Sequence, residues 1–186
     1  MKSKRKLLCL LMIAAVLALL LTACGSTDEP TEAGSPCPLE HYPAAEGGDG
    51  RLRIMTVKDV IAEMDAGHSF AVYFGFSSCP SCQAARPALI AATIEYDQIL
   101  GYVDTRADPA WTSNMDIDDY DLFVERFGDY IPLDENGLKH LYVPHVFFIR
   151  DGTVIYDVGS VPEGEEKSLS FAERKAAYAA GFEALT

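Results

Sequence analysis

The sequence predicts one α/β domain with a mixed central sheet and helices on both of its faces. The expected strands and helices follow the order βαβαβ, then an inserted segment, then ββα. The two strand–helix–strand crossovers make the first strands parallel, whereas a tight turn makes the last two antiparallel. The chain has 186 residues, which is enough for one buried core and too few for two ordinary domains.

Three apolar segments are expected to form the parallel strands: residues 51–55, 69–76 and 99–104. The middle segment is almost continuous in strand-forming residues, which is typical of a strand covered on both faces. The helix between the first two strands is expected to start after Thr56, a good N-cap residue, and to end at Gly67. A second helix is expected to begin at the cysteine pair that follows the middle strand.

The C-terminal part is expected to form a hairpin and a helix. Residues 145–158 are strand-like on both sides of Asp151-Gly152, a dipeptide that readily adopts the positive φ angles of a type I′ turn. Ser170 and Glu173 have the spacing of a capping box and predict the start of the last helix.

A helical insertion is expected over about residues 105–142, between the third strand and the hairpin. Apolar residues at helical spacing predict an amphipathic helix packed on the domain: Ile117, Tyr120, Val124 and Phe127.

Residues 1–23 have the pattern of an export signal. A basic start is followed by an apolar stretch, and its end, Leu21-Thr22-Ala23-Cys24, resembles a bacterial lipobox, in which the chain is cleaved before the cysteine and the cysteine is acylated. We therefore expect a bacterial lipoprotein, held on the extracytoplasmic face of the cell membrane by acyl chains on Cys24. An uncleaved anchor helix is the alternative.

Residues 24–50 are expected to be a flexible tether, since they are rich in Gly, Pro, Ser, Thr and Glu and show no hydrophobic period. The folded domain would then span residues 51–186. Cys37, between two prolines of the tether, is interpreted as a leftover free thiol. An intermolecular bridge and a contact to the domain are the alternatives.

The charge of the chain excludes one class of partner. It carries 15 basic and 28 acidic residues, a formal net charge of −13. Such an excess of negative charge repels phosphate backbones, so no nucleic-acid partner is expected.

Cys79 and Cys82 form the only close pair among five cysteines. Cys79 is expected at the N-cap of the second helix, where unpaired backbone N–H groups and the helix dipole favour a thiolate, and Pro80 suits the first helical position. Cys82 would lie one turn further on the same face, at a separation that suits a disulfide. We expect Cys79 to be the exposed nucleophile and Cys82 the shielded resolving thiol, in a cycle without a cofactor.

An inert disulfide and half of a zinc site are the alternatives for this pair. Closing so short a loop contributes little stability. Zinc at this pair would need two more ligands, and the sequence contains no second CxxC motif and no Cys-His pair to supply them. No metal is therefore expected.

The segment Tyr73–Cys82, with Pro87 after it, resembles the active-site strand and helix of the thioredoxin-like superfamily. Val143-Pro144, directly before the hairpin, matches the cis-proline of that family. The resemblance covers about residues 51–186 and implies that Val143 and Pro144 lie across from the cysteine pair and present backbone to the substrate. More narrowly, Tyr142-Val143-Pro144 with the hairpin and last helix resembles the bacteriocin transport accessory proteins.

The sequence departs from that family at three positions. Tyr73, Leu100 and Ser78 stand where thioredoxins have a buried Asp, a Lys and a Trp, so the usual proton-transfer pair is missing or rebuilt. His145, next to Pro144, could stabilise the Cys79 thiolate; a solvated loop histidine is the alternative.

The expected function is that of an extracytoplasmic thiol–disulfide oxidoreductase. Its substrates would be cysteine-containing exported proteins or peptides, and a redox partner protein would restore its starting state. The alternative is a non-catalytic accessory module that uses the same fold to hold a transporter or a peptide.

Overall fold

The computed structural model describes residues 37, 39–106, 117–160 and 169–186. The predicted export signal, Cys24 and the first part of the predicted tether lie outside these residues. Within the part that is described, none of the helices has the length and apolar character needed to cross a membrane.

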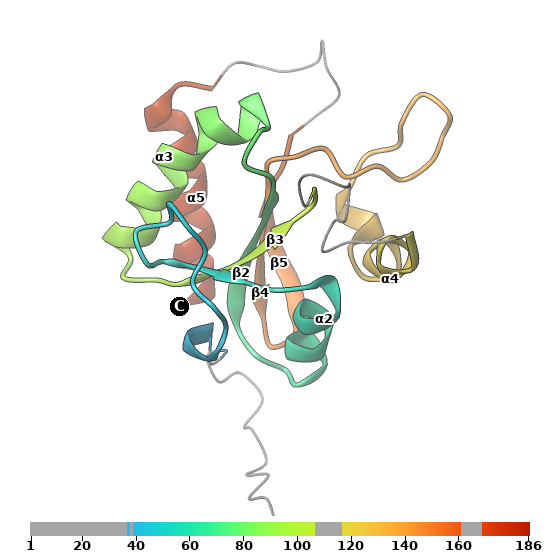
Figure 1. Ribbon diagram of the computed structural model, residues 1–186, viewed down its shortest axis with the longest axis horizontal. Helices are drawn as coiled ribbons and strands as arrows, with labels where there is room; N and C mark the ends of the chain where they lie inside the picture. Colours follow the sequence, from blue (N-terminus) through green and yellow to red (C-terminus); the bar gives the residue numbers. More distant parts are fainter. Residues whose placement is uncertain (1–36, 38, 107–116, 161–168) are drawn as a thin grey trace, which may run out of the picture. The chain divides into compact units, whose positions relative to one another are not determined.

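A five-stranded mixed sheet forms the centre of the domain (Figure 1). Its strands are β1 (Leu52–Ile54), β2 (Phe70–Gly75), β3 (Leu100–Asp104), β4 (His145–Arg150) and β5 (Thr153–Val158). They lie in the order β1-β3-β2-β4-β5, with β1, β3 and β2 parallel and both β4 and β5 antiparallel to their neighbours. The predicted α/β fold with a mixed sheet is confirmed.

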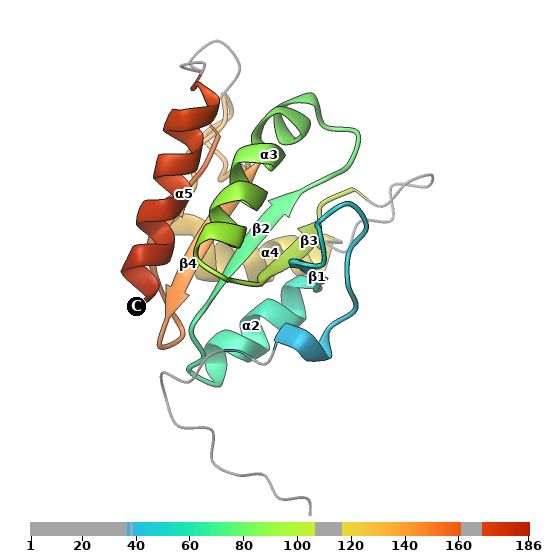
Figure 2. The ribbon, with the colours of Figure 1, turned by 90° about the vertical axis from the view of Figure 1, so that its left-hand side faces the viewer.

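Helices cover both faces of the sheet. They are α2 (Val57–Asp65), α3 (Pro80–Glu95), α4 (Ile117–Phe127) and α5 (Phe171–Leu185), with the short 3-10 helices η1 (Leu39–His41) and η2 (Gly128–Tyr130). Figure 1 shows α3 and α5 on one face and α2 and α4 on the other. Figure 2 shows α3 and α5 side by side.

Local sequence signals set several of these boundaries. Thr56 and Ser170 cap α2 and α5 through capping boxes with Asp59 and Glu173. The turn between β4 and β5 has positive φ angles of 53° and 72° at its two central residues, as the Asp-Gly dipeptide predicts.

The two faces of the sheet bury separate apolar layers. On the side of α2 and α4, Phe74, Phe123, Phe127 and Phe147 pack ring against ring. On the side of α3 and α5, the layer includes Tyr73, Leu89, Phe148 and Phe182. Every residue of β2 is buried, which agrees with its position at the centre of the sheet.

The domain starts earlier than the sequence predicts. Cys37, Leu39 and Ala45 are buried, and the N–H of Cys37 donates to the Ser69 carbonyl at 3.1 Å. The N–H of Ala45 donates to the Leu52 carbonyl at 2.9 Å. Residue 37 and residues 39–50 are therefore part of the domain and not of a tether. Their contacts are with residues distant in sequence, so no hydrophobic period marks them.

The insertion contributes α4 and a short following segment. Phe123 and Phe127 are fully buried, whereas Tyr120 and Val124 are half-buried. The predicted apolar face therefore omitted Phe123, which contacts Phe74 across the core. The Tyr120 hydroxyl donates to the Lys139 carbonyl at 2.8 Å and ties the segment after η2 to the helix.

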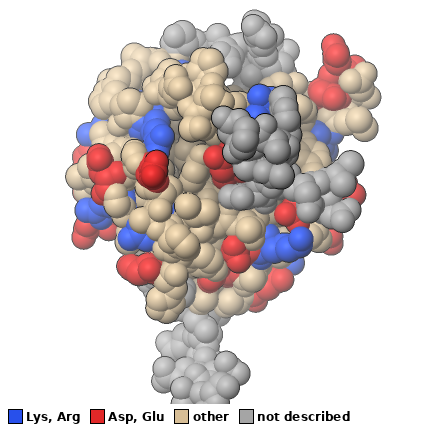
Figure 3. Space-filling view, viewed as in Figure 1, with Lys and Arg blue, Asp and Glu red and all other residues tan. Residues whose placement is uncertain are grey.

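Charged side chains of both signs mix on the surface. On the face drawn in Figure 3, Asp and Glu lie among Lys and Arg. Ion pairs join several of them, such as Arg51 with Asp97 at 2.8 Å and Arg126 with Asp65 at 2.6 Å. At exposed positions each such pair contributes little stability.

Candidate dithiol active site

The chain passes directly from β2 into the cysteine pair at the start of α3. Cys79 is the N-cap of α3, and Pro80 is its first residue. The N–H of Cys82 donates to the Cys79 sulfur at 3.1 Å. A sulfur that accepts a backbone N–H at a helix N-terminus is in a position that favours negative charge.

The loop between β2 and α3 is held by two hydrogen bonds. The Cys79 N–H donates to the Phe76 carbonyl at 3.2 Å, and the Gln83 side chain donates to the Ser77 carbonyl at 2.9 Å. These contacts fix the position of Cys79 relative to the end of β2.

Val143 and Pro144 lie across from the cysteine pair, as the resemblance implies. The peptide bond between them is cis. The Cys79 thiol lies 3.9 Å from the Val143 carbonyl oxygen and donates to it. The Ser160 hydroxyl donates to the Pro144 carbonyl at 3.2 Å and supports this loop from the end of the hairpin.

Tyr73 lies on β2, next to the cysteine pair. Its side chain is buried and hydrogen-bonds to Cys82. Burial raises the pKa of the Tyr73 hydroxyl well above its usual range, and the neighbouring Cys82 raises this pKa further. The hydroxyl passes over Gly75, where any Cβ atom would collide with it. The sequence shows that Tyr73 departs from the thioredoxin pattern. It does not show that Tyr73 contacts Cys82.

The surroundings of Cys82 disfavour its thiolate form. Burial, with the hydrogen bond to Cys79, raises the pKa of the Cys82 thiol to about 12. The backbone hydrogen bond from Phe76 and the side-chain hydrogen bond from Tyr73 lower the Cys82 pKa and partly offset the effect of burial. Cys82 therefore keeps its proton at neutral pH, as expected of a thiol that resolves a mixed disulfide after Cys79 has attacked.

Cys79 is more buried than predicted, whereas Cys82 is shielded as expected. Cys79 is 5% exposed and Cys82 is 2% exposed. The expectation of an exposed Cys79 is therefore wrong for the free dithiol form. The cause is the close approach of the Val143 carbonyl, which covers the sulfur from across the site.

His145 does not lie beside the pair. Side chains alternate along β4, so His145 shares a face with Phe147 and Ile149, on the side of α2 and α4. Its ring stacks on Phe147 at a centroid distance of 4.2 Å, and its Nε2 lies 2.9 Å from Asp157 Oδ2. Neither the modulating role at Cys79 nor the solvated loop histidine fits this arrangement, because the side chain is buried on the opposite face.

Comparisons with known proteins find solved structures of low sequence identity. No protein-family model and no curated protein matches the chain. Thioredoxin O2 of Arabidopsis thaliana in its oxidized state is 14% identical over 60% of this chain and 84% of its own, with a TM-score of 0.38. Thioredoxin O1 of the same plant is 14% identical over 60% and 86%, with a TM-score of 0.36. A proposed oxidoreductase with a thioredoxin fold is 13% identical over 72% and 96%, with a TM-score of 0.49.

The fold assignment rests on the geometry of the chain itself. The mixed sheet, the Cys79–Cys82 pair at the start of α3 and the cis peptide bond at Pro144 occur together in one domain. The described part of the chain has an α/β fold of the thioredoxin-like class.

Proposed function

We propose that this chain is a thiol–disulfide oxidoreductase that acts outside the cytoplasm on cysteine-containing exported proteins or peptides. One observation carries the proposal: Cys79 caps α3 and its sulfur faces the Val143 carbonyl beside the cis peptide bond. This arrangement puts a nucleophilic sulfur next to backbone that can pair with an extended client segment.

The reaction is a pair of thiol–disulfide exchanges. The Cys79 thiolate attacks one sulfur of a client disulfide, forms a mixed disulfide and releases the other client sulfur as a thiolate. The Cys82 thiolate then attacks the Cys79 sulfur, releases the second client thiolate and closes the Cys79–Cys82 disulfide. The client gains two electrons and the chain loses two. In reverse, the same steps oxidise a client dithiol, and a redox partner protein restores the starting form.

The location of the reaction rests on the N-terminal sequence. Acyl chains on Cys24 would hold the domain at the extracytoplasmic face of the cell membrane, where it would meet exported chains. The narrower resemblance to bacteriocin transport accessory proteins makes an exported peptide one candidate client.

A trapping experiment tests the enzyme proposal. Replacing Cys82 with Ser removes the resolving thiol, so the Cys79 mixed disulfide should accumulate and be isolated with its client from membranes. The matched control is the double variant Cys79→Ser/Cys82→Ser, which should trap nothing. Trapping that is equal in the two variants, or absent in both, would contradict the proposal.

The low exposure of both thiols favours a second candidate, a non-catalytic module that holds a transporter or a peptide. In that case the pair would form an inert disulfide. A reduction potential below about −300 mV, together with no trapped client, would support the module. A higher potential with a trapped client would support the enzyme.

A further inference from the structure

We propose that Cys37, Glu63 and His68 form a zinc-binding site, which goes beyond the proposed redox function. These residues offer a sulfur, a carboxylate oxygen and an imidazole nitrogen that all lie within 4.8 Å of one another. Cys37 and His68 are buried, and Glu63 is half-buried. No sequence motif contains all three residues. Cys37 belongs to the N-terminal segment, Glu63 lies in the last turn of α2, and His68 follows that helix.

The backbone fixes Glu63 and His68 relative to each other. Helix α2 ends in a left-handed residue, Gly67, with a φ angle of 75°. The His68 N–H donates to the Glu63 carbonyl at 3.1 Å and the Gly67 N–H to the Met64 carbonyl at 2.9 Å, which is the Schellman pattern. This turn carries the His68 ring back onto the Glu63 side chain, where Nδ1 lies 2.5 Å from Oε2.

Cys37 is brought to the same place by a separate contact. Its N–H donates to the carbonyl of Ser69, the residue next to His68. Its thiol hydrogen-bonds to Glu63. The third donor therefore comes from a different part of the chain, as is usual for a metal site that joins two segments.

A further residue orients the carboxylate. The Tyr42 hydroxyl donates to Glu63 Oε1 at 2.7 Å, while Oε2 faces His68. Outer hydrogen bonds of this kind fix ligand orientation in zinc sites. One carboxylate oxygen is thus held by Tyr42 and the other faces His68.

The donor set suits zinc. Tetrahedral zinc, with ligand distances of about 2.0–2.3 Å, separates neighbouring donor atoms by roughly 3.3–3.8 Å. The present distance of 2.5 Å between His68 Nδ1 and Glu63 Oε2 is that of a hydrogen bond, so these two side chains would have to move apart on binding. Sulfur, nitrogen and oxygen donors together favour zinc over magnesium or calcium, which prefer oxygen alone.

The charges balance on binding. The Cys37 thiol loses its proton to water and forms an S–Zn bond, and the ring proton of His68 resides on Nε2 so that Nδ1 can donate its lone pair. One thiolate and one carboxylate then neutralise Zn²⁺. A fourth position is left for water, as in sites with three protein ligands.

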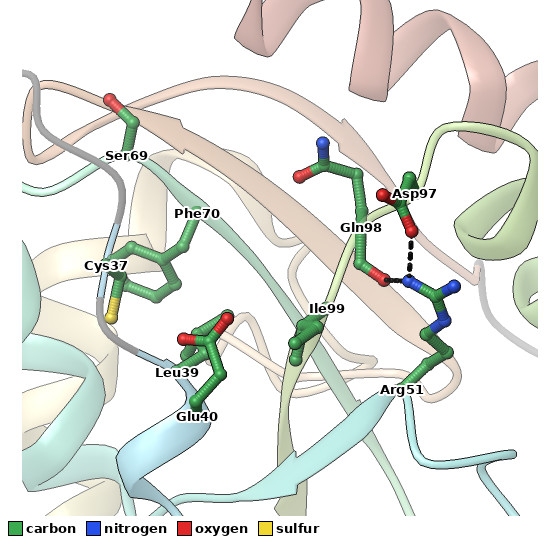
Figure 4. Close-up of a pocket in the computed structure, with 9 residues that line it drawn as sticks. All are labelled: Cys37, Leu39, Glu40, Arg51, Ser69, Phe70, Asp97, Gln98 and Ile99. Carbon is green, nitrogen blue, oxygen red and sulfur yellow. Dashed lines mark hydrogen bonds and ion pairs between the residues drawn. The ribbon is translucent and has the colours of Figure 1, made fainter.

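A pocket of about 260 Å³ lies beside Cys37, and Ser69 and Glu40 are among its other lining residues. Glu63 and His68 do not line it, so it reaches the cluster only at Cys37. Figure 4 shows Cys37 at one end of the pocket, with its sulfur directed away from Ser69. The pocket lining also includes Asp97, which is paired with Arg51.

Metal binding by the full chain in detergent solution tests this site. The Cys79→Ser/Cys82→Ser background removes the other described thiols, and Co²⁺ serves as a spectroscopic substitute for zinc. We expect one zinc ion per chain by calorimetry and a thiolate-to-cobalt charge-transfer band. Adding Cys37→Ser should abolish the band and weaken zinc binding by more than about 100-fold, since even outer-shell changes cost roughly 10–100-fold.

Matched variants separate a site from nonspecific binding. His68→Ala should weaken binding as Cys37→Ser does, whereas His140→Ala, at an exposed position, should leave it unchanged. Circular dichroism checks folding, and His68→Ala decides the result if Cys37→Ser does not fold. Absence of zinc binding and of the band in the background protein would overturn the proposal. Binding that survives both ligand substitutions would also overturn it, and the cluster would then be a hydrogen-bond network only.

Discussion

At the scale of single residues, Tyr73 is a side chain from outside the CxxC motif that acts directly on the Cys82 thiol. By the resemblance drawn from the sequence it stands where thioredoxins have a buried Asp, and its hydroxyl hydrogen-bonds to Cys82. An Asp can accept a proton from the resolving thiol, whereas a Tyr with a raised pKa can only donate a hydrogen bond to the thiolate. Tyr73 therefore acts by stabilising the Cys82 thiolate and not as a base.

Replacing Tyr73 with Phe should slow the resolving step. The fraction of Cys82 thiolate rises about tenfold per pH unit below its pKa of about 12. The Tyr73 hydrogen bond lowers that pKa, so its loss raises the pKa and shifts the pH–rate profile to higher pH. A contribution of ~1.4 kcal/mol lowers the thiolate fraction about tenfold, and the greater nucleophilicity of the more basic thiolate offsets part of this. We therefore expect a roughly three- to fourfold slower decay of a mixed disulfide with a model peptide, measured by rapid mixing across pH.

Tyr102→Phe is the control for this prediction. Its ring stacks on Tyr73 at a centroid distance of 5.4 Å, but its own hydroxyl is directed to Asp104. The profile should keep its position on the pH axis in this variant. An unshifted profile in Tyr73→Phe would mean that the hydroxyl has no part in resolution.

Residue-level predictions succeed where the cause is local. The N-cap position of Cys79 follows from the spacing of Cys79, Pro80 and Cys82, and the structure has it. The burial of Cys79 depends on Val143, which lies 64 residues further along the chain. The contact between Tyr73 and Cys82 likewise depends on how β2 packs against α3, which no local pattern specifies.

At the scale of secondary structure, β4 separates two roles that are adjacent in sequence. Val143 and Pro144 precede the strand, and the Val143 carbonyl faces Cys79, whereas His145 begins the strand and is buried on the other face. The period of two predicts that His145 lies with Phe147 and Ile149. It does not tell which of the two faces α3 covers, and so it cannot exclude a contact with Cys79.

His145→Ala should therefore affect stability and leave the dithiol site intact. The substitution removes the stacking on Phe147 and the contact to Asp157 and leaves a cavity next to the core. We expect the free energy of unfolding to fall by about 2–3 kcal/mol in urea titrations. The rate at which iodoacetamide modifies Cys79, followed by mass spectrometry of a digest, should change by less than about twofold.

The exposed His140 supplies the control, since His140→Ala should change neither quantity. A severalfold slower modification of Cys79 in His145→Ala, at unchanged stability, would restore the modulating role that the sequence suggests.

The other elements show what local signals determine: Ser170 with Glu173 and the Asp151-Gly152 turn lie where the sequence predicts them.

At the scale of the whole molecule, the N-terminal segment has two parts with different properties. Residues 39–50 pack on the domain, and Cys37 is paired with Ser69 through the backbone. Residues 47–50 are rich in Gly, as a linker is, and contacts to the rest of the domain make the segment part of the fold. If Cys24 is acylated as proposed, the stretch left to act as a tether is shorter than residues 24–50.

Membrane attachment should depend on Cys24. Two or more acyl chains hold a protein durably on a membrane, whereas a single chain binds reversibly. Replacing Cys24 with Ala should remove acyl-chain labelling and release the protein to the soluble extracytoplasmic fraction, as measured by labelling and cell fractionation. Cys9→Ala, in the same apolar stretch, should keep both the label and the membrane location. A Cys24→Ala protein that stays in the membrane fraction would indicate an uncleaved anchor helix, and the domain would then be tethered through residues 1–23 themselves.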